Sequence, residues 1–402
     1  MTYAIVAARA RVAAGWCVVA LGLTIPISTA ADGILIALLL IAWLAALPAN
    51  VGELKALALQ TPPTLAALLL FLLLLAGCAY ASVPPKESFR TLGKYLDLAL
   101  IPIFMWAAAH PAVRRRALVL FAIAVIANLY VAYTAAAGLP GLRSPHYPIG
   151  FKASVTHSIL VSLGAFLFLL YARETRRPGV RVALVAAAAL CAHNVLFIVI
   201  GRTGYVVLGL LLAYFMVTAV RGWRGPAYAL VAVASLAGAA YLTSPSLQQR
   251  VDEIGQDLEQ YRPGARDNTS VGQRLEYTRN TLAIVAEHPV LGVGTGGFAQ
   301  AYAERVRGTE SRTTTNPHND YALIAAQVGI PGFALLVALY VLAWHKARAL
   351  GTRLERDLVR GVTLAIAAGG LVNSLLLDHV EGLLFAWFTG LLYASYRRPA
   401  QP

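Results

Sequence analysis

The sequence predicts an all-α polytopic membrane protein with about 12 transmembrane helices and one large, mostly helical loop on the outer side. Two features of the composition lead to this fold class. Of the 402 residues, 58% are hydrophobic and only 13% are charged, whereas a soluble domain carries about 25% charged residues. The third observation is that the apolar residues form blocks, many of which reach the ~17–25 residues that cross a bilayer as a helix.

The expected spans follow one another along the chain. They lie near residues 12–29, 33–48, 63–80, 93–109, 115–137, 154–172, 180–200, 203–220, 225–243, 321–345, 357–377 and 380–396. The first block resembles a signal sequence, but it lacks a clear cleavage site and many spans follow, so we expect it to be retained. The chain then divides into residues 1–243 with nine spans, a loop of residues 244–320, and residues 321–402 with three spans and a tail.

The distribution of charge predicts the orientation of these spans. If the N-terminus lies inside and the spans alternate, most Lys and Arg residues outside the long loop fall in inner segments, as the positive-inside rule requires. This bias explains the net charge of +14 better than nucleic-acid binding does, so we expect no nucleic-acid partner. Both termini are therefore expected on the cytoplasmic side, and the long loop on the outer side.

The long loop is expected to be ordered and mostly helical. Apolar residues recur at helical spacing in "SLQQRVDEIGQDLEQY". The stretch "SVGQRLEYTRNTLAIVAEHP" opens with Ser270 and Gln273 at capping-box spacing and stops before Pro289. The glycine-rich "LGVGTGGF" then predicts a flexible or tight turn that leads to a further short helix through Tyr302 to Val306.

Two arginines on the outer side are candidate anion ligands. Arg202 lies in "FIVIGRTGYVVLG" between two apolar runs, and an arginine at a helix centre costs about 2.5–3.5 kcal/mol. Its side chain either reaches lipid headgroups or faces inward and binds an anion, which we favour because flanking glycines allow a ligand to approach the backbone. Arg274 lies in the first turn of the second loop helix. A solvated helix face explains it most simply, although a guanidinium at a helix N-terminus also suits phosphate.

His318 is the candidate general base. It follows Pro317 directly before an apolar segment, among the polar residues Asn316, Asn319 and Asp320. A lone histidine is more often structural than catalytic. This polar setting at the outer end of a span favours catalysis, because a neutral imidazole is the usual general base near physiological pH.

No metal or other cofactor is expected. The acidic residues of the first loop helix are better explained as its polar face than as metal ligands; they are Asp252, Glu253, Asp257 and Glu259. A two-metal site would require clustered Asp and His ligands, which the sequence lacks. The three cysteines, Cys17, Cys78 and Cys191, all fall inside apolar blocks and predict small core residues without disulfides.

Three motifs in order resemble the bacterial O-antigen ligase superfamily, which includes O-antigen polymerases and protein O-oligosaccharyltransferases. They are "GRTG" between two spans, then "GQRLEYTRNTLAIVAEHPVLGVGTGGF", then "NPHNDYALIAAQVGIPGF". The resemblance covers about residues 195–335 by motif and the whole chain by topology. Two departures are an extra glycine in "GVGTGGF" and Gln327, which stands where relatives often have an acidic residue.

The resemblance implies a glycosyltransferase of the bacterial inner membrane with its active site facing the periplasm. The implied donor is a glycan on undecaprenyl diphosphate, and in a ligase the implied acceptor is a sugar hydroxyl of lipid A–core oligosaccharide. The residue match implies that His318 is the catalytic base and that Arg202 and Arg274 bind the diphosphate. Diphosphate leaves without protonation once its charge is stabilised, whereas the acceptor hydroxyl needs a base. A single displacement would invert the anomeric carbon.

Further residues on the outer side are expected to extend the site. Four are basic residues of the early outer loops, for which contact with lipid headgroups is an equally good explanation; they are Lys86, Arg90, Arg143 and Lys152. The motif that contains His318 also contributes Asn319 and Tyr321. Asp378, at the turn between the last two spans, is expected to orient the base or an arginine.

Three alternative functions stay open at this point. An O-antigen polymerase would use another lipid-linked glycan as acceptor, and a protein O-oligosaccharyltransferase would use a protein. The latter often carries an additional C-terminal periplasmic region, whereas this chain ends at "YRRPAQP", which we expect inside. A lipid-linked glycan transporter would explain the spans and the outer cations. It would favour charges at mid-membrane depth and would need no large ordered loop ending in a histidine.

Overall fold

Every regular element in the described part of the chain is helical. The computed structural model describes residues 2–139, 148–199, 201–220, 222–243, 245–264 and 269–396, and no strand occurs among them. The helices are α1 (Thr2–Thr24), α2 (Thr29–Gln60), α3 (Pro62–Gly77), α4 (Pro85–Gly93), α5 (Leu96–Ala107), α6 (Pro111–Ala136), α7 (Ser154–Glu174), α8 (Pro178–His193), α9 (Arg202–Ala219), α10 (Arg224–Thr243), α11 (Pro245–Gln260), α12 (Ser270–Glu287), α13 (Phe298–Arg305), α14 (Asp320–Lys346), α15 (Arg353–Gly369) and α16 (His379–Tyr393). A π-helical turn, Asn194–Ile198, follows α8, and a 3₁₀ turn, Leu375–Leu377, precedes α16.

Six of the described helices are long and apolar enough to cross a membrane. They are Ala4–Thr24, Thr29–Leu47, Pro111–Ala136, Ser154–Glu174, Pro178–Ile198 and Asp320–Ala349. The pair Asn50–Gln60 and Pro62–Gly77, bent by 90°, gives a seventh if it is counted as one span. Length and composition therefore support a multi-pass membrane protein, and its described regular elements are all helical, as predicted.

The predicted number of spans goes beyond these helices. Each of the twelve apolar segments is helical over most of its length. Some of the helices are short, however: α5 has 12 residues and α16 has 15. At about 1.5 Å per residue these helices fall short of a hydrocarbon core of about 30 Å. Twelve spans therefore remain a prediction.

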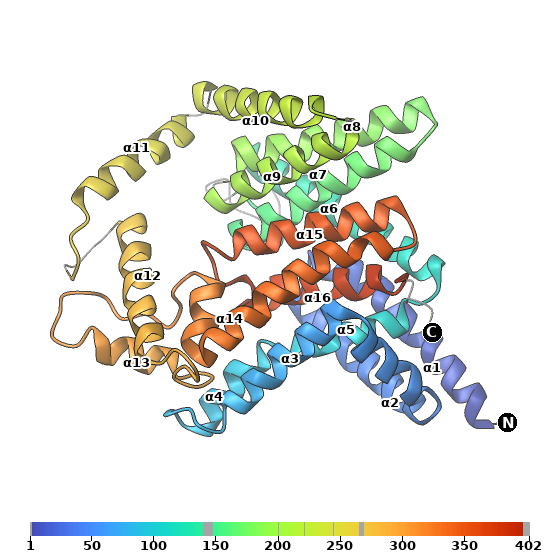
Figure 1. Cartoon of the computed structure of the whole chain (residues 1–402). Coiled ribbons are helices and arrows are strands. Elements are labelled where there is room, and N and C mark those ends of the chain that lie inside the picture. The colour runs from blue at the N-terminus through green and yellow to red at the C-terminus, as the bar shows by residue number, and fades with distance from the viewer. Residues whose placement is uncertain are drawn as a thin grey trace.

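The three C-terminal helices form the centre of the bundle. Figure 1 shows α14, α15 and α16 between the N-terminal helices α1 to α5 and the group α6 to α10. In this arrangement α14 packs against α3, α15 against α9 and α7, and α16 against α5. Helices α11 to α13 lie to one side of the bundle (Figure 1), where α12 packs against α14.

Helix α16 is buried along its whole length and anchors this centre. The Trp387 and Phe388 rings pack on Phe121 of α6, with ring centroids 6.2 and 5.1 Å away. The Trp387 indole N–H donates a hydrogen bond of 3.0 Å to the carbonyl of Val18 in α1. A buried indole N–H requires such an acceptor, so these contacts hold α16, and the turn before it, in one position.

Two ion pairs join segments that were predicted to face the cytoplasm. Arg114 Nε lies 2.8 Å from Glu355 Oε1, and Arg173 Nη2 lies 2.6 Å from Asp357 Oδ2. All four side chains are largely buried, so removal of one partner would leave an uncompensated charge at a cost of about 3–5 kcal/mol. The pairs gather these segments at one end of the bundle, while α14 begins at the other end. The orientation of the bundle across the membrane remains a prediction.

Candidate active site

His318 occupies a strained turn directly before α14. Its φ of 56° makes it the one non-glycine residue with a positive φ in the described part of the chain. The His318 N–H donates a hydrogen bond of 2.8 Å to Asn316 Oδ1. The imidazole lies against the ring of Tyr277 in α12, with centroids 6.3 Å apart and planes 27° from parallel. Left-handed backbone costs about 1–2 kcal/mol for a residue with a Cβ, and such strain is concentrated at functional sites.

The side chains of Asn319 and Tyr321 form hydrogen bonds that fix the start of α14. Asn319 Oδ1 caps the helix by accepting a hydrogen bond of 2.9 Å from the Ala322 N–H, and its Nδ2 donates to the Leu371 carbonyl at 3.0 Å. The Tyr321 hydroxyl donates to the Ala367 carbonyl at 2.8 Å. Both predicted site residues therefore position His318 by fixing α14 against the end of α15.

Asp320 is the strongest link between α14 and the turn that precedes α16. Its side chain is 0% exposed. Its carboxylate accepts hydrogen bonds from the Leu375 N–H at 3.0 Å and from the Leu376 N–H at 3.2 Å, and its own N–H donates to Gly370 at 2.8 Å. A buried carboxylate needs such donors, so the turn of residues 370–378 and the start of α14 must form together.

The same turn connects the start of α9 to His318. The hydroxyl oxygen of Thr203, the residue after Arg202, accepts a hydrogen bond of 2.7 Å from Asn373 Nδ2. The next residue, Ser374, donates at 2.7 Å to Asn316 Oδ1, which is also the acceptor for the His318 N–H. The backbone of Arg202 begins α9, and its side chain lies outside the described part of the structure. The contacts thus bring the backbone of two predicted site motifs together.

Arg274 of α12 is close enough to His318 to act on it electrostatically. Burial of the His318 ring and the positive charge of Arg274 both lower the pKa of His318 below its usual value. Helix α12 begins after Thr269, whose side chain accepts a hydrogen bond from the Gly272 N–H at 3.1 Å. The helix was predicted to start here, although with Ser270 as the capping residue. The structure therefore places Arg274 of α12 near His318, which lies in the turn before α14.

Glu276 holds the helical loop against the residues that lead to His318. It accepts hydrogen bonds from the Tyr261 hydroxyl at 2.7 Å, from Asn280 Nδ2 at 2.8 Å and from the Ser311 hydroxyl at 2.9 Å. Burial alone would raise the pKa of Glu276, but these hydrogen bonds to the charged form leave it lowered. The ordered, helical loop predicted from the sequence is present as α11, α12 and α13.

Helix α14 is interrupted at residues 328–329, near its middle. Val328 and Gly329 leave helical geometry, with φ/ψ of −133°/23° and 72°/−172°. Pro331 follows and has no N–H, so the Gln327 carbonyl has no donor four residues later. The Ile330 N–H donates instead to the Pro289 carbonyl at 2.8 Å, which also leaves the Ala326 carbonyl without its helical donor.

The glycine-rich segment supplies the missing donors. The Val293 N–H donates to the Ala326 carbonyl at 2.8 Å, and the Gly294 N–H donates to the Gln327 carbonyl at 2.9 Å. Gly294 has φ of 84°, a conformation that favours glycine. The segment predicted as a flexible or tight turn is therefore a tight turn docked on the break in α14.

The contacts of Gln327 fit an amide better than the acidic residue that the resemblance predicts at this position. Its Oε1 accepts a hydrogen bond from the Gly296 N–H at 3.0 Å, while its Nε2 donates to the Tyr95 hydroxyl at 3.2 Å. The side chain is 1% exposed. This arrangement needs both a donor and an acceptor, which an amide provides and an ionised carboxylate does not.

The turn with His318, the turn of residues 370–378 and the break in α14 form one assembly. A cavity of about 450 Å³ lies beside this assembly. Asn316 and Gln327 line it from the His318 side, and Glu87 and Arg90 of α4 and the following Lys94 line it from the other. Asp378 also lines it. Burial raises the pKa of Asp378, and the positive charge of Lys94 acts in the opposite direction. Of the predicted secondary residues, Arg90 and Asp378 are therefore close to the assembly around His318.

The other predicted basic residues are placed differently. Lys86 is exposed on α4 and does not line the cavity. Lys152 is 8% exposed, and its burial lowers its pKa, while the carboxylates of Asp32 and Glu381 act in the opposite direction. Arg143 lies outside the described residues. Within the described part of the chain, no three His, Cys, Asp or Glu side chains gather as a metal site would require.

Sequence reasoning missed several residues of this assembly. Lys94 follows Arg90 by four residues and Lys86 by eight, so helical periodicity could have found it. Asn373, Ser374 and Tyr277 carry no local signal, because their role depends on contacts with distant segments.

Comparison with known proteins identifies the part of the chain that carries this assembly. Residues 186–337 match the family model described as O-Antigen ligase. This segment belongs to the O-antigen ligase superfamily. The match supports a membrane glycosyltransferase of ligase or polymerase type, as the resemblance in sequence had indicated. The matched segment contains Arg202, Arg274 and His318, whereas α4 and the turn of residues 370–378 lie outside it.

One curated protein is similar to this chain over a short region. An uncharacterized protein of Haemophilus influenzae is 27% identical over 116 residues, which are 27% of this chain and 29% of the relative. The match therefore covers less than a third of that protein's length.

Proposed function

We propose that this protein transfers O-antigen polysaccharide from undecaprenyl diphosphate to a sugar hydroxyl of lipid A–core oligosaccharide. The observation that carries the proposal is the proximity of His318 and Arg274. They join a base and a cation at one end of a membrane bundle, within a segment matched to the O-antigen ligase family.

His318 acts as the general base in this proposal. The acceptor hydroxyl transfers its proton to the imidazole while its oxygen attacks the anomeric carbon of the donor. The bond from that carbon to the diphosphate oxygen breaks, and undecaprenyl diphosphate leaves with the electron pair. One displacement inverts the anomeric carbon. The lowered pKa of His318 supports this role, because only the neutral imidazole accepts a proton.

Arg202 and Arg274 bind the diphosphate. Guanidinium groups form paired hydrogen bonds with phosphate oxygens, and they stabilise the charge that develops as the leaving group departs. This account needs no metal ion. We expect the purified enzyme to keep its turnover in excess EDTA; loss of turnover on chelation and its return with Mg²⁺ would contradict the account.

The cavity lined by Arg90, Lys94 and Asp378 receives the acceptor. The lining carries two cations, Arg90 and Lys94, and two carboxylates, Glu87 and Asp378. The cations suit a phosphate on a core sugar, and the carboxylates suit sugar hydroxyls. Arg90 has no ion pair within the described residues, so its replacement by Gln should leave folding intact. We expect that replacement to raise the KM for the acceptor and to leave the KM for the donor unchanged.

The proposed topology places this assembly at the periplasmic face of the inner membrane. Twelve spans, a periplasmic loop of residues 244–320 and two cytoplasmic termini complete it. The ion pairs Arg114–Glu355 and Arg173–Asp357 support the grouping of inner segments at the opposite end.

Reconstitution with defined acceptors tests the function. Purified protein in nanodiscs receives lipid-linked donor together with lipid A–core, a second lipid-linked glycan, or a protein acceptor. We expect glycan to appear on lipid A–core, and His318→Asn to abolish the transfer. Extension of the second lipid-linked glycan would instead identify a polymerase, and transfer to protein an oligosaccharyltransferase. Donor movement across proteoliposomes without transfer to any acceptor would identify a transporter.

A further inference from the structure

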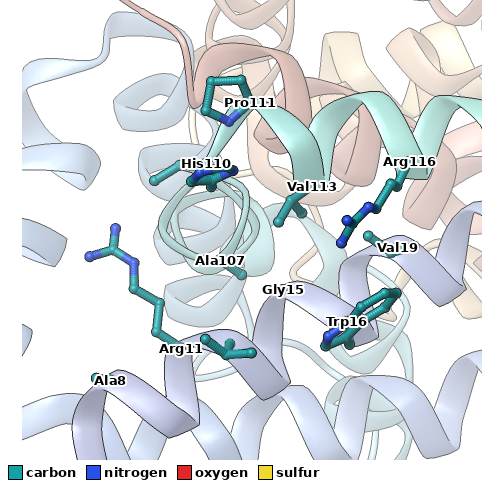
Figure 2. A pocket seen from close by; sticks show the side chains of 12 residues that line it. Ala8, Arg11, Gly15, Trp16, Val19, Ala107, His110, Pro111, Val113 and Arg116 are labelled. Atoms are coloured by element: carbon teal, nitrogen blue, oxygen red, sulfur yellow. The ribbon is translucent and has the colours of Figure 1, made fainter. Parts of the chain in front are cut away.

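A second cavity lies between α1 and α6, away from the candidate active site. It has a volume of about 590 Å³, within the range of about 300–1,000 Å³ that is usual for ligand pockets. Figure 2 shows Arg11 of α1 on the side of the cavity nearer His110, and Trp16 of α1 below Arg116 of α6. Both helices are candidate membrane spans.

One side of this cavity is apolar. Val12, Trp16 and Val19 lie on one face of α1, at the helical spacing of four and seven residues, and all three line the cavity. Trp16 is 56% exposed. Gly15 lets the helices approach closely, since a Cβ there would lie 3.3 Å from Val113 Cγ2. This side offers a surface for a hydrocarbon chain.

Arg11 borders the cavity with its charge already paired. Its Nη1 and Nη2 donate to the two carboxylate oxygens of Glu53 at 3.0 and 2.6 Å, and its Nε donates to the Trp106 carbonyl at 3.2 Å. A guanidinium has five N–H groups, so these three bonds leave two for a ligand. The pair contributes fixed donors but no net charge.

Arg116 supplies the net positive charge. Its Cζ lies 5.2 Å from the centroid of the Trp16 ring, and Figure 2 shows the guanidinium extending over that ring. No ion pair to Arg116 occurs within the described residues. His110 adds a donor: its Nδ1 accepts a hydrogen bond of 3.2 Å from the Ala112 N–H, so the neutral ring carries its own N–H on Nε2.

We infer that this cavity binds one phospholipid with an anionic headgroup, such as phosphatidylglycerol. Its phosphate would meet Arg116, its headgroup hydroxyls would face His110 and the free N–H groups of Arg11, and an acyl chain would lie along Val12, Trp16 and Val19. The charges of Arg11, Glu53 and Arg116 sum to one positive charge, which a singly charged anionic headgroup neutralises. A zwitterionic headgroup would bring its own ammonium next to Arg116. Basic pockets between spans bind such headgroups in other membrane proteins.

Native mass spectrometry of the purified full chain tests the inference with phosphatidylglycerol and phosphatidylcholine as probes. We expect wild type to retain one phosphatidylglycerol more tightly than phosphatidylcholine. Arg116→Gln should weaken phosphatidylglycerol about fivefold, which corresponds to ~1 kcal/mol per basic residue at a membrane surface. Arg115→Gln is the matched control, because Arg115 is an exposed neighbour that does not line the cavity.

The outcomes are distinguishable. Loss confined to Arg116→Gln supports the site. Equal weakening in Arg115→Gln and Arg116→Gln would reduce the effect to general surface charge and overturn the inference. Equal retention of both lipids by wild type would also overturn it, and this comparison needs no variant to fold. None of these results depends on whether the chain transfers a glycan.

Discussion

The left-handed backbone of His318 allows its chemical role to be separated from its structural role. Three replacements remove the imidazole and its contact with Tyr277 alike: His318→Gly, His318→Asn and His318→Ala. They differ in how well they adopt the observed φ of 56°. Glycine adopts this conformation without steric cost and asparagine tolerates it, whereas alanine retains a cost of about 1–2 kcal/mol.

The expected magnitudes differ for turnover and for stability. Loss of a general base reduces turnover about 10²–10⁴-fold, which is about 3–5 kcal/mol of activation free energy. That loss should be the same in all three variants. The free energy of unfolding should be lower in His318→Ala than in His318→Gly by about 1 kcal/mol, once the entropy of glycine in the unfolded chain is included.

The assay measures turnover in nanodiscs beside the thermal midpoint and the donor affinity of each variant. Donor affinity should stay near that of wild type, because Arg202 and Arg274 remain. The reasoning fails if turnover follows stability, with His318→Gly near wild type and His318→Ala inactive. In that case His318 would be a turn residue and the base would lie elsewhere.

Three further predictions follow from the same contacts. Because burial and Arg274 lower the pKa of His318, turnover should be flat through neutral pH and fall as acid protonates the imidazole; Arg274→Gln should move this limb to higher pH, and Arg274→Lys should not. Gly292→Ala places a Cβ 2.5 Å from the backbone of α14 at a φ of 67°, so thermal unfolding should show a loss of about 2–4 kcal/mol; an unchanged midpoint would show that the turn can move away from α14. In spheroplasts of a cysteine-free variant, an impermeant thiol reagent should label Glu310→Cys and not Arg115→Cys, and the reverse pattern would invert the proposed orientation.

The sequence alone determined the helices and the residues with a chemical signature. Long apolar blocks predicted most helices of the bundle, because burial or insertion of a helix requires apolar side chains along the segment itself. They did not predict the short polar helix α4 or the part of α2 that follows residue 48. The loop helices α11 and α12 follow from apolar spacing and from the proline at position 289 that ends the second. Arg274 and His318 were found through motifs, and the structure places them within electrostatic reach of each other.

Only the tertiary structure decided what holds His318 in place. The turn of residues 370–378 meets α14 through Asp320 and α9 through Asn373, between segments that are 55 and 170 residues apart. The glycine-rich turn meets backbone carbonyls of α14 that a break in the helix leaves without donors. Local patterns record the preferences of a segment, whereas each of these contacts needs a partner from a distant segment, and many of those partners are backbone groups that every residue carries. Their partners are therefore set by how the helices pack and leave no signature in the sequence.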